Sequence, residues 1–238
     1  MKAYYDLHMH TCLSPCSKDE MTPNNVVSMS MIKGLDVIAI TDHNSIENCE
    51  AAIKVGKKRD VLVIPGMELQ TLEDVHLICL FRDLKTISEF ADFIEEKKLK
   101  IPNKPEKYGH QLILDANDET IGEDPYLLIT SANISVEAAF KKVRDMGGFI
   151  FPAHIDRASN SLVTNLGFIP DNLAIKYVEV STNPSGEKIL IDEKYDKYIK
   201  LINSDAHILE KISERTNYIE VDELSIDSVF KSLFKEER

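Results

Sequence analysis

The chain has 238 residues, of which 43% are hydrophobic and 29% are charged, and its formal net charge is −12. This length suits one large domain or two small ones, and the composition is typical of a globular protein, not of a disordered chain. The negative charge repels phosphate backbones, which disfavours nonspecific binding to duplex nucleic acid, although a metal site can still attract one small anionic substrate.

The first residues and the apolar runs predict a cytoplasmic protein without a membrane segment. Residues 1–6 lack the apolar stretch of a signal peptide, and the longest apolar runs, such as residues 61–65, are too short to span a bilayer. The four cysteines form no dense disulfide framework, so we expect free or metal-bound thiols in a reducing cytosol.

Short apolar runs alternate along the chain with segments of helical periodicity. We expect strands at residues 4–10, 36–41, 61–69, 75–81, 148–153, 177–181 and 201–204. Apolar side chains recur with helical spacing from Ile87, from Val136 and from Ile226, which predicts three helices. Thr22, followed by a proline, and Ser225 are residue types that begin helices.

This alternation predicts an α/β protein built on a mainly parallel sheet, which is either open or closed into a barrel. Residues 99–131 interrupt the rhythm with three prolines, and residues 111–118 have the pattern of a hairpin. We expect this stretch to be an insertion over one rim of a single domain spanning residues 1–238. The insertion is either a functional cover or a decorative loop.

The first predicted strand carries two histidines that are two residues apart. Side chains at i and i+2 of a strand point to the same face, so Asp6, His8 and His10 project together. Two imidazoles held in this way can chelate one metal ion, and Asp6 can orient them from behind. The alternative is a pair of surface histidines, or of core histidines with satisfied hydrogen bonds.

Three further strands run directly into residues that commonly bind metals. His43 follows residues 36–41, Glu68 follows the apolar run at 61–65, and Asp205 and His207 follow residues 201–204. Catalytic groups lie at such strand ends on α/β scaffolds. If the sheet closes, its first and last strands become neighbours, which brings these groups together.

Taken together, these motifs resemble the PHP (polymerase and histidinol phosphatase) family. The matching motifs extend over residues 6–207 and are Asp6-Leu-His8-Met-His10-Thr11, Ile40-Thr41-Asp42-His43, Gly66-Met-Glu68, His76, Pro152-Ala-His154 and Ser204-Asp205-Ala-His207. The resemblance implies a distorted seven-stranded (β/α)7 barrel, two or three divalent ions, commonly zinc, manganese or iron, and hydrolysis of phosphoesters.

The resemblance also implies which residues bind the metals. His8 and His10 would share one ion with Glu68 and Asp205, and Glu68 would bridge to a second ion. His76 and His154 would complete the second site, while His43 and His207 would belong to a third.

Cys16 follows His10 at a distance where some relatives carry a histidine ligand, and a thiolate is a good ligand for zinc or iron. We therefore expect Cys16 in the third site. The alternatives are a structural cysteine in a turn, or a ligand from Asp19 or Glu20.

Four other polar residues each leave two interpretations open. His76 lies in an apolar strand and is either a core histidine or a ligand, while Arg157 is either a phosphate clamp or part of a surface ion pair. Glu179, also within an apolar strand, either supports the site or pairs with a cation. His110 is either a plain loop residue or one that contacts substrate.

The function we expect is hydrolysis of a small phosphomonoester or phosphodiester by a metal-bound hydroxide, with Asp205 and Arg157 as catalytic residues. The proton for the leaving oxygen could come from bound water, from Asp205 or from a histidine. Histidinol phosphate is one possible substrate among several. Amide hydrolysis is a rival activity, and a metal-binding regulatory module without turnover is a rival from outside enzymes.

Overall fold

The computed structural model describes residues 1–181 and 192–235. Each of the seven predicted strands and the three predicted helices is present, with shifts of a few residues at their ends. The strands are β1 (Lys2–Met9), β2 (Val37–Ile40), β3 (Leu62–Gln70), β4 (His76–Leu80), β5 (Leu112–Leu114), β6 (Thr120–Glu123), β7 (Phe149–Pro152), β8 (Tyr177–Val180), β9 (Ile199–Ile202) and β10 (Tyr218–Glu220). The α-helices are α1 (Pro23–Ile32), α2 (Cys49–Arg59), α3 (Leu84–Glu95), α4 (Pro105–Tyr108), α5 (Val136–Asp145), α6 (Leu162–Leu166) and α7 (Ile226–Lys235).

The main sheet has six strands in the order β10-β1-β2-β3-β4-β7. Its β1–β2 and β2–β3 pairs are parallel, but β10 pairs antiparallel with β1, and β4 runs antiparallel to both β3 and β7. The prediction of a mainly parallel sheet was therefore wrong for the pairs made by β10 and β4. The connection between β3 and β4 is short, and a short connection permits a hairpin but not the crossover that parallel strands need.

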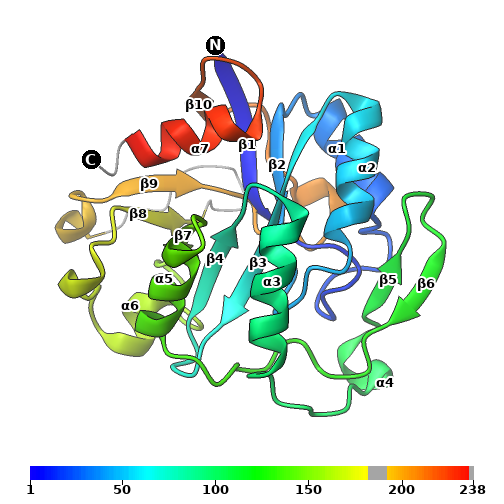
Figure 1. Ribbon diagram of the computed structural model, residues 1–238, viewed down its shortest axis with the longest axis horizontal. Coiled ribbons are helices and arrows are strands. Elements are labelled where there is room, and N and C mark those ends of the chain that lie inside the picture. Colours follow the sequence, from blue (N-terminus) through cyan, green and yellow to red (C-terminus); the bar gives the residue numbers. More distant parts are fainter. Residues whose placement is uncertain (182–191, 236–238) are drawn as a thin grey trace.

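Strands β8 and β9 form a separate parallel pair that lies between the two ends of the curled sheet (Figure 1). On one side, the amide of Ile155 donates to the carbonyl oxygen of Glu179 at 3.0 Å. On the other side, the amide of Asp205 donates to the carbonyl oxygen of His8 at 3.0 Å, and Met9 bridges to Ala206. The chain thus forms an α/β fold with a curled sheet, and its first strand lies beside the segment that follows β9.

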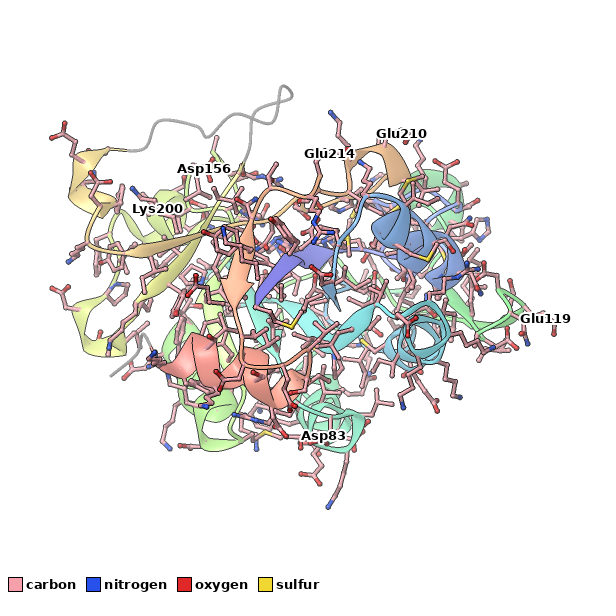
Figure 2. The ribbon with its side chains drawn as sticks, turned by 90° about the horizontal axis from the view of Figure 1, so that it is seen from above. Asp83, Glu119, Asp156, Lys200, Glu210 and Glu214 are labelled. Carbon is pink, nitrogen blue, oxygen red and sulfur yellow. The ribbon has the colours of Figure 1, made fainter. Side chains whose placement is uncertain are left out.

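Helices pack around the sheet, and their first residues follow the expected chemistry. Thr22, Ser135 and Ser225 each accept a hydrogen bond through the side-chain oxygen from an amide in the first turn of α1, α5 and α7. Phe90 of α3 and Phe140 of α5 are fully buried against β4 and β7 in one large core cluster. The exposed acids labelled in Figure 2, including Asp83, Glu119, Glu210 and Glu214, lie around the periphery.

The predicted insertion forms a small appendage beside α2 that contains α4 and the β5–β6 hairpin (Figure 1). Asp118 turns the hairpin with φ of +62°, a left-handed conformation that aspartate tolerates better than most residues. Among the described residues, no helix is long and apolar enough to cross a membrane.

Candidate metal centre

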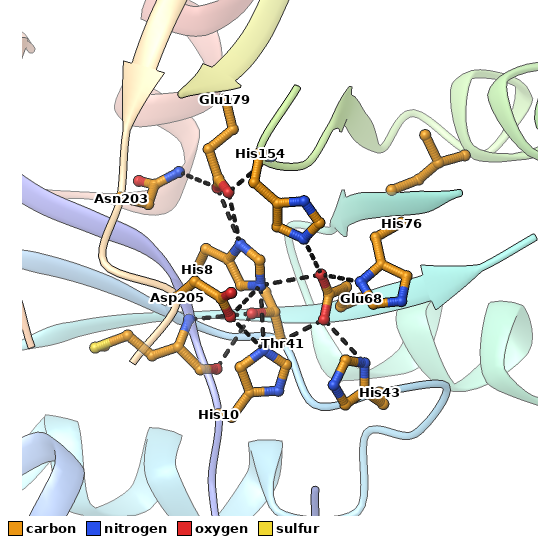
Figure 3. Close-up of polar contacts among 12 residues, drawn as sticks. His8, His10, Thr41, His43, Glu68, His76, His154, Glu179, Asn203 and Asp205 are labelled. Atoms are coloured by element: carbon orange, nitrogen blue, oxygen red, sulfur yellow. Dashed lines mark hydrogen bonds and ion pairs between the residues drawn. The ribbon is translucent and has the colours of Figure 1, made fainter. Parts of the chain in front are cut away.

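His8 in β1 and His10, directly after the end of β1, face the centre of the curled sheet, as their spacing predicts (Figure 3). His8 and His10 are fully buried, and their Nε2 atoms lie 3.1 Å apart. Neighbouring strands then bring acidic groups to the same point. The sheet thus concentrates groups from several parts of the chain in one buried cluster.

The carboxylate of Glu68, near the end of β3, is the centre of this cluster (Figure 3). It is 1% exposed, and imidazole nitrogens from five histidines surround its two oxygens. His43 Nδ1 and His76 Nδ1 lie 2.9 Å from these oxygens, and the Nε2 atoms of His8, His10 and His154 lie 3.3 Å from them.

Asp205 provides the second carboxylate, just beyond β9. Its Oδ1 lies 3.1 Å from His8 Nε2 and 3.0 Å from His10 Nε2, while its Oδ2 lies 2.5 Å from Arg157 Nη1. The Nδ1 of His207 lies 2.9 Å from the backbone oxygen of Asp205. Asp205 has φ of +48° and His154 has φ of +27°, so backbone strain is concentrated at this site, as it often is at functional sites.

Three groups of side chains have ligand atoms close enough together to hold a metal ion. They are His8, His10, Glu68 and Asp205; His43, Glu68 and His76; and His10, His43 and His207. Metal–ligand bonds of about 2.1 Å place neighbouring ligand atoms about 3.0–3.4 Å apart, which matches the separations in the cluster.

Several atoms of the cluster also lack a hydrogen-bond partner. Glu68 Oε2, Asp205 Oδ1 and the Nδ1 atoms of His43 and His76 are buried and lie close to one another or to other ring nitrogens, but none of them makes a hydrogen bond of acceptable geometry. Leaving such atoms without a partner is costly, and bound cations would remove that cost. The residues present therefore fit several divalent ions.

Side chains behind His8 and His10 determine which ring nitrogen of each histidine carries the proton. His8 Nδ1 lies 3.0 Å from both oxygens of Glu179, and His10 Nδ1 lies 2.9 Å from Ser14 Oγ, which donates to Asp42 Oδ1 at 2.7 Å. A proton on each Nδ1 satisfies these acceptors and leaves each Nε2 lone pair directed into the cluster. Both histidines are thus oriented as metal ligands.

The charges of the cluster shift the pKa values of its members in opposite directions. Burial lowers the pKa of His10, but the hydrogen bonds and charges of Asp205 and Glu68 outweigh it and raise the pKa to about 9. The same balance, led by the charge of Glu179, raises the pKa of His8 well above its usual value. Burial lowers the pKa of His43 to about 4, and burial also lowers that of His207 to about 3.

Both carboxylates keep their charge despite burial. Burial raises the pKa of Glu68, but the charges of His76, His8 and His43 outweigh it and hold the pKa well below the usual range. The pKa of Asp205 is likewise held well below its usual value, chiefly by His8 and His10. The cluster is therefore built around permanent negative charge, which attracts cations.

The structure brings together every predicted ligand except one. Cys16 is in none of the three groups found among the described residues; His154 is in none of them either, but its Nε2 lies 3.3 Å from Glu68 Oε1. Desolvation of the thiol and the charges of Glu68 and Asp205 raise the pKa of Cys16 to about 12 in the metal-free fold. Asp19 and Glu20, the alternatives for this position, are exposed and absent from the groups as well.

Two other polar residues singled out in the sequence, Asp6 and His110, lie away from the ligand atoms. Asp6 does not contact the imidazoles; its carboxylate instead accepts backbone amides of Ser204 at 3.1 Å and Ser213 at 3.0 Å. Asp6 therefore fixes the loop that carries Asp205 to β1 through these two hydrogen bonds. His110 lies on the hairpin, where its Nδ1 is 3.1 Å from Glu123.

Sequence reasoning missed the supporting roles of three residues. Ser14 and Asp42 orient His10, and Asn203 Nδ2 donates to Glu179 Oε2 at 2.8 Å. Asp42 belongs to the Ile40-Thr41-Asp42-His43 motif, and Ser14 lies four residues after His10. Neither position alone indicates a hydrogen bond to a metal ligand.

The chain belongs to the PHP family, because the model of the PHP domain matches residues 6–224. This confirms the resemblance seen in the motifs. An uncharacterised protein of Methanocaldococcus jannaschii is 24% identical over 218 residues, which cover 92% of this chain but 23% of that protein. The chain thus spans about a quarter of the length of this relative.

Solved structures share the fold at low sequence identity. The lesion-specific endonuclease PfuEndoQ of Pyrococcus furiosus matches with a TM-score of 0.68 and 18% identity over 97% of this chain and 55% of that one. A complex of Endonuclease Q with a 27-mer duplex substrate matches with a TM-score of 0.71 and 18% identity over 99% of this chain and 57% of that one. A protein of Bifidobacterium adolescentis, described as a metal-dependent phosphoesterase, matches with a TM-score of 0.60 and 16% identity over 98% and 96% of the two chains.

Proposed function

We propose that residues 1–238 form a metal-dependent phosphoesterase domain that hydrolyses a small phosphomonoester or phosphodiester. In this proposal, β8 and β9 complete a distorted seven-stranded barrel around the site. The observation that carries the proposal is the buried Glu68 carboxylate, which is surrounded by five imidazoles whose outer partners hold two of them as ligands. In a satisfied hydrogen-bond network, the buried atoms of Glu68, Asp205, His43 and His76 would each make a hydrogen bond of acceptable geometry.

We assign two or three ions, zinc, manganese or iron, to the ligands His8, His10, His43, Glu68, His76, His154, Asp205 and His207. When bound, such ions lower the pKa of water and neutralise charge on phosphoryl oxygens. Carboxylate and imidazole ligands suit all three metals. Cys16 stays a prediction for the third site, since it lies outside the three ligand groups found among the described residues.

Arg157 has a different role, which is to bind the substrate. Its guanidinium pairs with Asp205 Oδ2 and lines the same small cavity of about 100 Å³ as His154 and Glu68. Because a guanidinium matches two phosphate oxygens, Arg157 can orient the phosphoryl group beside the ligands. Its 43% exposure leaves it accessible to an incoming anion.

The activity is tested with the purified full chain. Elemental analysis should find two or three ions per chain, and a panel of phosphomonoesters and phosphodiesters with added manganese should reveal turnover that a chelator abolishes. A chain that binds metal but hydrolyses no compound of the panel would instead support a metal-binding regulatory module. Histidinol phosphate belongs in the panel as one named substrate.

Arg157→Ala should lower kcat/KM for the phosphoester identified in the panel by about 10- to 100-fold, because a charge-assisted hydrogen bond is worth about 1.5–3 kcal/mol. Arg157→Lys should recover only part of the loss, since lysine cannot bind two oxygens in a fork. Arg82→Ala is the matched control, because Arg82 pairs with Asp227 at 3.3 Å on an exposed surface. Equal kinetics for Arg157→Ala and Arg82→Ala would contradict this role.

A nuclease is the second candidate, favoured by the two endonuclease folds. The net charge of −12 disfavours binding to a nonspecific duplex, as the sequence indicated, so a nuclease of this kind would have to recognise a feature of its substrate other than the phosphate backbone alone. Abasic and undamaged duplexes should therefore be included beside the small esters. Cleavage of the abasic duplex alone would favour the nuclease over the small-ester phosphoesterase.

A further inference from the structure

The insertion at residues 99–131 is attached to the domain by a buried asparagine beside the metal centre. Asn48, at the start of α2, is fully buried. Its Nδ2 donates to the carbonyl oxygen of Leu112 at 3.1 Å, and its Oδ1 accepts from the amide of Leu114 at 2.9 Å. The Asn48 side chain thus makes one donor and one acceptor hydrogen bond to the backbone of β5, as a neighbouring strand would.

The same amide continues inward to a metal ligand. Asn48 Nδ2 donates to Thr11 Oγ1 at 2.9 Å, and Thr11 Oγ1 donates to Asp42 Oδ2 at 2.7 Å. The other oxygen of Asp42 accepts from Ser14 Oγ, whose oxygen lies 2.9 Å from His10 Nδ1. All five side chains are buried. An unbroken series of hydrogen bonds therefore joins β5 to His10.

A second buried asparagine attaches the far end of the insertion. Asn44 directly follows His43, and its Nδ2 donates to the carbonyl oxygens of Leu128 and Thr130, each at 2.8 Å. Its Oδ1 accepts from the amide of Gln70 at 3.0 Å. Asn44 has φ of +47°, a conformation that asparagine adopts more readily than most residues. The backbone beside His43 is thus fixed by contacts with the insertion.

The insertion is itself internally braced, so it can act as a support. Gln111 is fully buried, and its Nε2 donates to the carbonyl oxygens of Asp124 at 2.8 Å and Tyr126 at 2.7 Å. Gly109 has φ of +97°, and a Cβ there would lie 2.4 Å from the carbonyl oxygen of Pro15. The insertion therefore packs directly against the loop that carries Ser14.

We infer that the insertion is a positioning element of the metal centre, and that it acts through Asn48 and Asn44 on His10 and His43. These two histidines share a ligand group with His207, so the ion at that group depends most on the insertion. His8 is held independently by Glu179. The inference rests on the proposed function only in requiring that the cluster binds metal.

The test is a zinc titration of the metal-free full chain against a competing chelator, which needs no substrate. Asn48→Ala should weaken zinc binding by about 10- to 100-fold at the two ligand groups that contain His10, the usual cost of losing a partner behind a metal ligand, and should affect the group of His43, Glu68 and His76 least. Asp118→Ala is the matched control. It removes the contacts of the hairpin tip with the start of α1, since Asp118 accepts from Thr22 Oγ1 at 2.5 Å and from the amide of Asn24 at 3.1 Å, but it leaves the bonds of Asn48 to β5 and the series of bonds to His10 in place.

Equal zinc affinities in Asn48→Ala and Asp118→Ala would overturn the inference, as would a wild-type chain that binds no zinc. If Asn48→Ala does not fold by circular dichroism, Thr11→Val decides, because it keeps the side-chain shape and removes only the hydroxyl in the series. Unchanged zinc affinity in Thr11→Val then overturns the inference. A wild-type chain that binds zinc but hydrolyses no phosphoester would refute the proposed activity and leave this inference standing.

Discussion

Replacing Glu68 with alanine should remove metal binding at the two ligand groups that contain this carboxylate and abolish phosphoester hydrolysis. Removing a partner that merely supports a ligand costs about 10- to 100-fold in affinity or activity, and Glu68 lies at the centre of two of the three ligand groups. We therefore expect hydrolysis of the substrate found in the panel to fall by more than about 100-fold. Elemental analysis after dialysis should find fewer ions per chain than in the wild type.

Glu123→Ala is the control for this substitution. Glu123 is an exposed carboxylate that pairs with His110 on the hairpin, so its loss changes the net charge equally without touching the cluster. Metal content and turnover should match the wild type in Glu123→Ala. A Glu68→Ala protein that retained its ions would show that the cluster does not bind them through this carboxylate.

The metal-free protein should become less stable as the pH rises from about 6.5 to 9. The pKa of His10 is about 9 in the fold, against 6.5 for an unperturbed histidine, so the folded state holds a proton that the unfolded state has released. This stability is fully present below pH 6.5 and is lost as the pH rises through 9. For His10 alone it amounts to about 3 kcal/mol, or roughly 6–12 °C in Tm.

Differential scanning calorimetry in the presence of a chelator would measure this fall in Tm. His10→Gln should reduce the decline, because one of the two histidines with a raised pKa is gone while His8 remains, and added zinc should flatten it, since bound metal replaces the proton. A Tm that stays level over this range in the metal-free wild type would contradict the raised pKa of His10.

The sequence identified the strands and most of the groups in the cluster because both depend on local patterns. The spacing of His8 and His10 places them on one face of a strand, and acids directly after apolar runs mark the ends of strands. The family motifs then supplied His76 and His154, whose position in an apolar strand or after a proline would not otherwise indicate a ligand. The ligands from the two ends of the chain lie close together because the curled sheet brings β1 beside the segment after β9.

The directions of the later strands and the supporting hydrogen bonds depend on contacts between distant residues. Whether β4 runs parallel or antiparallel depends on the short turn after β3, which periodicity does not report. The roles of Ser14 and Asn48 require the insertion to lie against the first loop, and no local pattern encodes that approach. Cys16 stays a prediction for a related reason, since spacing alone does not show which way a turn points its thiol.

The junction between β1 and the segment after β9 also has a consequence for the order of folding. The amide of Leu7 donates to Asn203 Oδ1 across 196 residues of sequence, and Met9 bridges to Ala206 at the same place. During synthesis, the N-terminal histidines emerge long before their acidic partner, and contacts this distant in sequence form slowly. The two ligand groups that contain His10 are therefore complete only once Asp205 and His207 have been added, and metal acquisition at these groups becomes one of the last events of folding, whereas the group of His43, Glu68 and His76 needs no residue from this junction.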